Sequence, residues 1–444
     1  MRIQKLPAFF RKPFVKYIAG FCITVVLAVA LLAAAAFLPQ DVILNHVVDS
    51  IDFIYDTYGN NSIFDRSEAS LMDVLSDTMM LRTSLSTNSN YLGSILTNPV
   101  YTYEGLKEWV DVDEMLVRQA YEMPTDGVWF YCRYWMGFRT VLRLALTVFT
   151  FAQIKRYLAV IFFTLFMAVV CSVAKNTNTK IAFLFAMSIV LVRPHVIATS
   201  MQYTSCFLIG FLAMLMIPWL RRRPEYEGLF FMEVGMLTMY FDFYTVPLIT
   251  MGFPLVYLCV LKQSAGERMP LKKLLRNLFA WFAGYGFMWI AKLVLTTVLT
   301  SENALKQGFE SFAGRVGIQK DAELEQFYSV ELAFERLREV IFSDDTGKVV
   351  YLLCVGIILA VVIWKLLRGH SSGKCLADGI PFLIMAMIPL AWFVITKQPI
   401  AIHAFFQYRS IALTHWASGM FLYFLLSAKK QSASDTRCIK EGSA

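Results

Sequence analysis

The chain has 444 residues, of which 57% are hydrophobic and 17% charged, and its formal net charge is +8 at pH 7. Soluble domains carry about 45–50% apolar and about 25% charged residues, so this composition excludes an ordinary soluble protein and indicates a polytopic membrane protein. The positive charge does not indicate a nucleic-acid partner, because most Lys and Arg residues flank apolar runs, as in cytoplasmic loops of membrane proteins.

The first apolar run covers residues 17–38 and follows a basic start. A secretory signal peptide has a shorter apolar core of about 7–15 residues, whereas a membrane-spanning helix needs about 20. An uncleaved first transmembrane helix is therefore favoured over a signal peptide. Residues 1–38 are expected to form a cytoplasmic N-terminus and this helix.

Further apolar runs predict an all-α fold, a polytopic transmembrane helix bundle of ten or eleven spans. The number depends on one doubtful segment. The predicted spans are 17–38, 138–154, 157–173, 181–201, 204–220, 229–245, 247–262, 277–299, 348–367, 380–396 and 409–427.

Basic residues predict the orientation of the bundle, because short cytoplasmic loops are enriched in Lys and Arg. The basic residues of 2–16 and 429–430 place both termini in the cytoplasm, and the basic segments 221–223, 262–276 and 365–374 are predicted to be cytoplasmic too. Successive spans must cross the membrane in alternating directions, and upstream of residue 204 the number of predicted spans is one too many for this orientation. Either 181–201 is re-entrant, since Arg, Pro and His interrupt it at 192–195, or one short span within 138–173 does not cross.

Two long outer loops separate the transmembrane regions. Both contain stretches of helical amphipathic periodicity, which predict helices lying along the outer membrane surface. The predicted regions are 1–38, the outer loop 39–137, the transmembrane segment 138–300, the outer loop 301–347, the C-terminal helices 348–428 and the cytoplasmic tail 429–444.

Two opposite charges lie inside apolar runs, Asp242 and Lys292. A charge in the middle of a bilayer costs roughly 3 kcal/mol or more, so such residues pair with each other or mark a functional site. Both interpretations stay open: a buried Asp242–Lys292 pair, or two residues that contact a substrate.

Basic residues on the outer side oppose the positive-inside trend and need another explanation. Guanidinium, ammonium and phenol groups suit a phosphate or pyrophosphate, which accepts several charge-assisted hydrogen bonds. The alternative is an interfacial belt of snorkelling side chains. The candidate substrate-binding residues are Arg133, Tyr134, Arg139, Arg143, Arg193, His195, Asp242, Lys292, Lys397, His403, Tyr408 and Arg409.

Acids in the first outer loop are candidates for a general base. Asp41 directly follows the first span, and Asp73 and Asp77 are four residues apart, on one helical face. Each of them singly is also typical of a solvated helix face. The scattered Cys and His residues show no metal-ligand spacing, and no cofactor is indicated.

Several motifs resemble pieces of a group of bacterial multi-span proteins associated with surface-polysaccharide synthesis, although Met136 replaces a histidine there. The overall architecture resembles the GT-C glycosyltransferases. The matching motifs are LSDTMML (75–81), YCRYWMGF (131–138), SMQYT (200–204), YFDFYTVPLITMGFPL (240–255), GYGFMWIAK (284–292) and HAFFQYR (403–409).

The GT-C resemblance implies a polyprenyl-phosphate sugar as donor, a cell-envelope glycan or lipid-linked acceptor, and a site at the outer face of the bacterial cytoplasmic membrane. It also implies an acidic base in the first outer loop, for which Asp77 is favoured over Asp52 and Asp41. A transporter or accessory subunit for lipid-linked polysaccharide is the alternative. Transporters usually consist of two related halves, and no such repeat is visible.

Overall fold

The structure is a computed structural model, in which nearly all secondary structure is helical. It describes residues 13–59, 68–86, 91–107, 110–318, 323, 325–343 and 373–427, with short pieces between 348 and 363. The predicted span 348–367 and the predicted tail 429–444 lie mostly or wholly outside the described residues.

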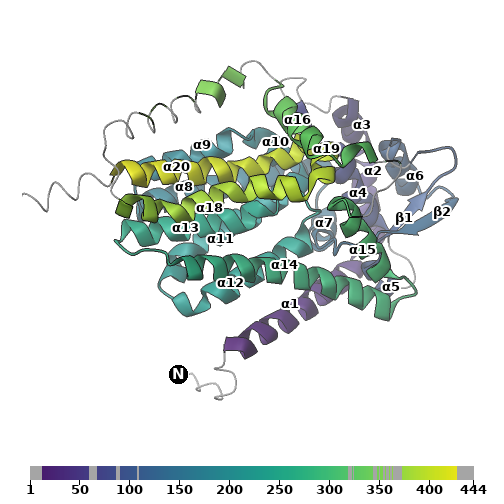
Figure 1. Ribbon diagram of the computed structural model, residues 1–444. Helices are drawn as coiled ribbons and strands as arrows, with labels where there is room; N and C mark the ends of the chain where they lie inside the picture. Colours follow the sequence, from purple (N-terminus) through teal and green to yellow (C-terminus); the bar gives the residue numbers. More distant parts are fainter. Residues whose placement is uncertain are drawn as a thin grey trace, which may run out of the picture.

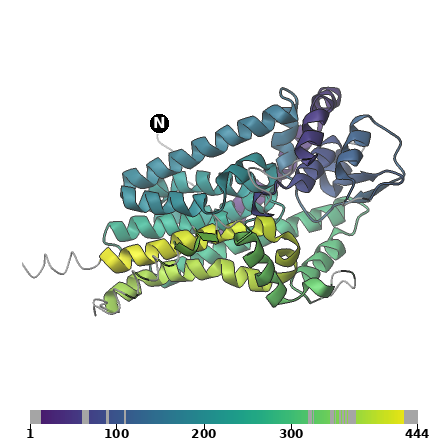
Figure 2. The ribbon, with the colours of Figure 1, turned by 90° about the horizontal axis from the view of Figure 1, so that it is seen from above.

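Long apolar helices lie side by side and form a bundle (Figures 1 and 2). Their side chains are apolar on nearly every face, as expected for helices buried in a protein or a membrane. The bundle helices are α1 (Pro13–Ala36), α8 (Phe151–Asn176), α9 (Thr179–Val190), α11 (Met201–Arg221), α12 (Glu227–Phe241), α13 (Leu248–Ser264), α14 (Leu271–Leu299), α18 (Gly373–Ile395) and α20 (Ile411–Ser427).

Shorter elements gather at one end of the bundle, and we call this region the cap (Figure 1). The outer loops supply most of it. The cap elements are α2 (Gln40–Val48), α3 (Ile51–Gly59), η2 (Glu68–Ser70), α4 (Val74–Leu85), α5 (Tyr91–Thr97), β1 (Pro99–Thr102), α6 (Val112–Ala120), β2 (Gly127–Phe130), α7 (Phe138–Leu146), α10 (Pro194–Thr199), α15 (Ala304–Arg315), η4 (Glu325–Phe327), α16 (Val330–Ile341), α19 (Lys397–Gln407) and η5 (Tyr408–Ser410).

The prediction of a helical membrane bundle is confirmed, although fewer helices than predicted have the length of a span. Among the described residues five helices are long and apolar enough to cross a membrane: α1, α8, α11, α14 and α18. The apolar helices α9 and α13 are shorter. Helices α12 and α20 of the bundle also have fewer than 18 residues, so the number of ten or eleven spans stays a prediction.

The predicted spans 138–154 and 157–173 form one long helix and one short one. Helix α7 ends at Leu146, and Thr150 starts α8 with a capping box. In this box Gln153 N donates to Thr150 Oγ1 at 3.4 Å, and Thr150 N donates to Gln153 Oε1 at 3.0 Å. Such a reciprocal cap fixes the start of a helix, so the first predicted span is short and belongs to the cap.

The segment 181–201 passes along the bundle and does not return to the side where it began. Asn178 at the start of α9 donates to Tyr423 Oη near the end of α20, at 3.0 Å. Beyond α9, Arg193 donates to Ser70 in the cap. Arg193 has φ +59°, and Pro194 opens α10, so the helix breaks where Arg, Pro and His interrupt the apolar run. The re-entrant interpretation was wrong, and the short α7 accounts for the extra span.

A two-stranded antiparallel hairpin interrupts the helices of the first loop. Strand β1 pairs with β2 so that Pro99 faces Phe130 and Thr102 faces Gly127. The expectation of an all-helical loop missed this hairpin, because each strand is only four residues long and shows no clear alternation. The hairpin leads directly into the YCRYW segment at 131–135.

Candidate functional site

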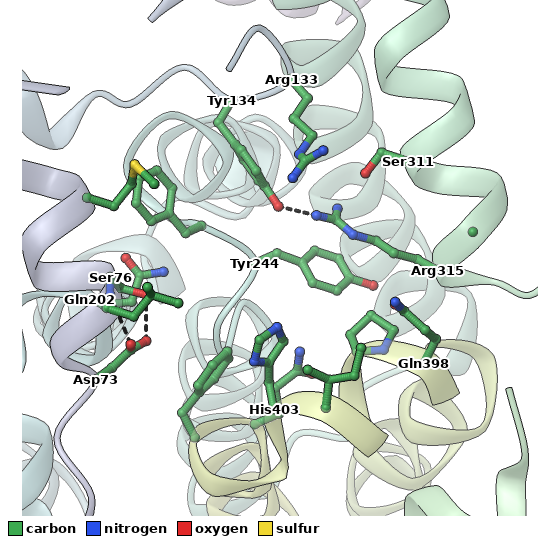
Figure 3. A pocket seen from close by; sticks show the side chains of 18 of the residues that line it. Asp73, Ser76, Arg133, Tyr134, Gln202, Tyr244, Ser311, Arg315, Gln398 and His403 are labelled. Carbon is green, nitrogen blue, oxygen red and sulfur yellow. Dashed lines mark hydrogen bonds between the residues drawn. The ribbon is translucent and has the colours of Figure 1, made fainter. Parts of the chain in front are cut away.

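A cavity of about 1120 Å³ lies where the cap meets the bundle. Segments far apart in the chain form its wall: the start of α4, the loop after β2, the turn after α12, and helices α15 and α19 (Figure 3). Aromatic rings surround a set of polar groups. The charged and amide side chains of the lining are Asp73, Arg133, Gln202, Gln307, Glu310, Arg315, Gln398 and Gln407.

Asp73 supplies a carboxylate on one side of this cavity (Figure 3). It is the N-cap of α4, where Ser76 N donates to Oδ1 at 3.0 Å and Ser76 Oγ donates to Oδ2 at 2.6 Å. Burial raises the pKa of Asp73 to about 6, although the Ser76 hydrogen bonds oppose this shift. At neutral pH the group is therefore mostly ionised and can accept a proton.

Two guanidinium groups lie on another side of the cavity (Figure 3). Arg133 donates to Tyr131 Oη at 3.0 Å and lies 4.4 Å from the centroid of that ring. Arg315 donates to Tyr134 Oη and lies 4.6 Å from the centroid of the Tyr244 ring. Among the described residues, neither arginine forms an ion pair with a carboxylate. Their charge is therefore available to an anionic ligand.

Two backbone distortions occur at the cavity wall. Tyr244 has φ +70°, a conformation that costs on the order of 1–3 kcal/mol for a non-glycine residue and concentrates at functional sites. His403 has non-helical angles (φ −121°, ψ 33°) inside α19. Burial and the nearby Arg315 charge lower the pKa of His403 to about 4, so this imidazole is neutral at physiological pH.

Gln307 joins α15 to the loop that carries Arg133. Its Nε2 donates to Phe130 O at 2.9 Å, and its Oε1 accepts from Cys132 N at 2.9 Å. This pair of hydrogen bonds matches an amide side chain to an extended backbone. It holds the two arginine-bearing segments in a fixed relation, although they come from different outer loops.

Three of the predicted substrate-binding residues line the cavity: Arg133, Tyr134 and His403. They come from the YCRYW and HAFFQYR motifs, which lie far apart in the chain. The structure brings these two motifs together at the cavity, whereas their role in binding stays a prediction.

Arg139 and Arg143 do not line the cavity. Both are buried. Arg139 donates to Asn98 Oδ1 at 3.0 Å and to Ser94 O at 3.3 Å. Because backbone carbonyls and an amide accept their hydrogen bonds, these cations hold the cap together. Phosphate binding by them stays a prediction that this geometry does not favour.

Arg143 binds the end of the first bundle helix. Its Nε donates to Ala35 O at 2.8 Å, its Nη2 to Leu38 O at 3.3 Å and its Nη1 to Gln40 Oε1 at 3.0 Å. A cation at a helix C-terminus satisfies carbonyls that lack an intrahelical partner.

The other basic candidates surround the cavity without lining it. Arg409 is buried and donates to Ala69 O at 2.9 Å and to Phe405 O at 2.6 Å. Tyr408 is buried beside it. Arg193 is bonded to Ser70, and His195 follows in α10. Lys397 starts α19.

The buried pair between Asp242 and Lys292 does not form. Asp242 follows α12 and accepts from Thr245 N at 3.0 Å and from Thr245 Oγ1. Lys292 instead donates to Leu96 O at the end of α5 and lies 5.7 Å from the centroid of the Trp135 ring. Each group therefore has its own hydrogen-bond partner, and neither side chain is in the cavity lining.

None of the three predicted catalytic acids lines the cavity. Asp77 is buried, accepts from Lys155 Nζ at 2.9 Å and accepts from Met201 N at 3.0 Å. Asp41 and Asp52 are exposed on α2 and α3. A catalytic role for them stays a prediction that this geometry does not favour, because a base must reach the hydroxyl that it deprotonates.

Sequence reasoning missed Asp73 and Arg315. Asp73 was noticed only as the helical neighbour of Asp77, and its signal is the N-cap pattern of Asp73 followed by Ser76 before the apolar run of α4. Arg315 lies at the end of α15, and no local pattern distinguishes it from the other charges of the second outer loop.

Comparison of the chain with protein-family models, curated proteins and solved structures finds no match. Within the described residues, no three His, Cys, Asp or Glu side chains are close enough together to hold a metal ion. The fold and its apolar helices define a multi-pass helical membrane protein with a polar cavity at one end of the bundle.

Proposed function

We propose that the protein is an integral membrane glycosyltransferase, which moves a sugar from a polyprenyl-phosphate donor to a cell-envelope glycan or a lipid-linked acceptor. The observation that carries the proposal is the composition of the cavity. A carboxylate with a pKa of about 6 shares it with two guanidinium groups that have no carboxylate partner among the described residues.

Asp73 is the proposed general base. It removes the proton of the acceptor hydroxyl while that oxygen bonds to the anomeric carbon of the donor sugar. The bond between the anomeric carbon and the phosphate oxygen breaks, and the phosphate leaves with the electron pair. The proton remains on Asp73 until water removes it. Asp73 takes the role that the sequence assigned to Asp77, because Asp73 lines the cavity.

Arg133 and Arg315 are the proposed ligands of the leaving phosphate. Guanidinium groups donate two parallel hydrogen bonds to phosphate oxygens and stay charged at any physiological pH. Negative charge develops on the phosphate as the glycosidic bond breaks, and fixed donors stabilise that charge in the transition state. The tyrosines that hold both arginines keep these donors in place before the substrate binds.

The location of the cavity supports a lipid-linked substrate. It lies at the junction of the apolar bundle with the cap, where a phosphate can be polar while its hydrocarbon stays in the bilayer. The opposite end carries Arg221, Arg222, Lys262 and Lys273, which by the positive-inside rule belongs in the cytoplasm. The cap and cavity then face the outer side of a bacterial cytoplasmic membrane.

The direct experiment is transfer of radiolabelled sugar from polyprenyl phosphate by purified protein. Asp73→Asn should remove transfer, whereas Asp56→Asn should retain it, because Asp56 is an exposed carboxylate of the same cap. Thermal unfolding of both variants shows whether the fold is intact. Full transfer by a folded Asp73→Asn variant contradicts the assignment of the base, and absence of transfer by the wild type with every donor contradicts the proposed function.

A further inference from the structure

The end of the bundle opposite the cap carries a cluster of cationic side chains that share one carboxylate. Glu227 begins α12, is fully buried, and accepts from Lys262 Nζ and Lys273 Nζ, both at 2.9 Å. Arg276 lies 3.8 Å from the same carboxylate. Lys16 lies next to this group, 5.1 Å from the centroid of the Tyr226 ring.

One carboxylate therefore pairs with cations from two other helices, α13 and α14. Among the described residues, Glu227 is the only acid that the structure pairs with Lys262, Lys273 or Arg276. Like charges at such short distances repel, so the cluster gains stability from a further anion. The other basic residues of this end differ: Arg221 pairs with Glu267, and Arg268 with Asp378.

Helix geometry adds to this positive potential. The N-termini of α12 and α14 meet at Glu227, and neither Tyr226 nor Pro270 caps its helix with a side-chain hydrogen bond. The first-turn amides of a helix carry a partial positive charge and bind phosphate oxygens. Two such termini and the surplus cations therefore act on the same place.

Apolar surface begins directly beside these cations. On α14, Lys273 and Arg276 are followed by Phe279, which is 74% exposed, and Leu275 between them is 49% exposed. Tyr226 stacks on Trp219 at the same level, with the ring centroids 6.3 Å apart. Aromatic rings of this kind lie at the headgroup level of a bilayer, so a charged headgroup and an acyl chain can be bound together.

We infer that the starts of α1, α12 and α14 form a binding site for the phosphate headgroup of an anionic phospholipid. Arg276 and Lys273 contact the phosphate, since their side chains are 50% and 24% exposed, whereas that of Lys262 is only 7% exposed. The ion pairs with Glu227 hold Lys262 and Lys273 in position. The acyl chains lie along the exposed apolar face of α14. This site is separate from the cavity and does not depend on the proposed activity.

The test is native mass spectrometry of the full chain in detergent with phosphatidylglycerol or phosphatidylcholine. The wild type should retain phosphatidylglycerol in preference, and Lys273→Gln/Arg276→Gln should weaken it about tenfold, as expected for the loss of two charge-assisted hydrogen bonds. The matched control is Arg221→Gln/Arg268→Gln, which removes two charges from the same end and should change binding less than about twofold.

Each other result contradicts the inference. Equal weakening in the control means that the general surface charge attracts the lipid, and no weakening in either variant means that the lipid binds elsewhere. Binding of inorganic phosphate that depends on Lys273, without retention of phosphatidylglycerol, means a soluble anion. If the double variant does not fold, lipid binding by Arg276→Gln alone decides the question. This change should leave the fold intact, because the Arg276 side chain is half exposed and its distance to Glu227, 3.8 Å, is long for an ion pair.

Discussion

The Arg315 guanidinium donates a hydrogen bond to the Tyr134 hydroxyl, although the two residues are 181 positions apart in the chain. This contact joins the second outer loop to the first at the wall of the cavity. Arg133, beside Tyr134, adds the second guanidinium. The proposed phosphate site therefore exists only when both loops are folded against the bundle.

Replacement of Arg315 tests this phosphate site. Arg315→Gln should weaken binding of a polyprenyl phosphate without sugar by about tenfold to a hundredfold, because a hydrogen bond to a charged group contributes about 1.5–3 kcal/mol. Arg315→Lys should recover little of the loss, since an ammonium lacks the planar fork. Equilibrium binding of a labelled lipid phosphate measures both variants.

Arg338→Gln is the control for this replacement, because Arg338 is an exposed cation of α16 in the same loop. Its binding should equal that of the wild type. Unchanged binding in a folded Arg315→Gln variant would show that the phosphate lies elsewhere.

The pKa of Asp73 predicts a pH dependence of transfer. A general base must be ionised, so the rate should rise with pH through about 6 and level off above it. The rate of Asp73→Asn should be lower by about a hundredfold or more, and it should no longer rise with pH through this range. Asp73→Glu should keep a rising limb at a lower rate. A limb that persists in Asp73→Asn would assign the titration to another group.

The same raised pKa has an opposite effect on stability. Between the ordinary value of 3.8 and about 6, the folded protein holds the Asp73 proton more tightly than the unfolded chain does. The contribution of this group to the free energy of unfolding therefore decreases as pH rises through this window. Denaturation of wild type and Asp73→Asn at pH 4 and pH 7 should show a smaller stability difference at pH 4.

The Asp77–Lys155 ion pair is predicted to stabilise the junction of the cap with α8. Asp77→Asn or Lys155→Met alone should lower the free energy of unfolding by about 3–5 kcal/mol, because each leaves a buried charge without its partner. Asp77→Leu/Lys155→Met should recover much of that loss. Thermal unfolding in detergent measures it. A fully stable but inactive Asp77→Asn variant would instead favour the catalytic role predicted from sequence.

Asp242 and Lys292 should behave as independent residues. In a double-mutant cycle of Asp242→Asn and Lys292→Met, the coupling energy should stay below about 0.5 kcal/mol, as for residues without a shared contact. Each single change should still destabilise, since each removes a buried hydrogen bond. A coupling above about 2 kcal/mol would restore the ion pair that the sequence suggested.

The sequence predicted the membrane bundle because apolar length is a direct consequence of the bilayer. It also singled out Arg133, Tyr134 and His403, which line the cavity. It could not separate these from Arg139 and Arg143, because a guanidinium that binds backbone carbonyls looks the same in sequence as one that binds a ligand. Asp73 and Asp77 share a helical face, and only the packing of α8 decides which of them pairs with a lysine.

The hydrogen bonds of Arg143 have a consequence for how the chain sits in its membrane. They attach the end of α1 to the cap through Ala35, Leu38 and Gln40. A slide of α1 by one turn, about 5.4 Å, would break all of these bonds together. The immersion depth of the first helix is therefore coupled to the folding of the cap, so that thinner or thicker bilayers should tilt the whole molecule before they displace this helix.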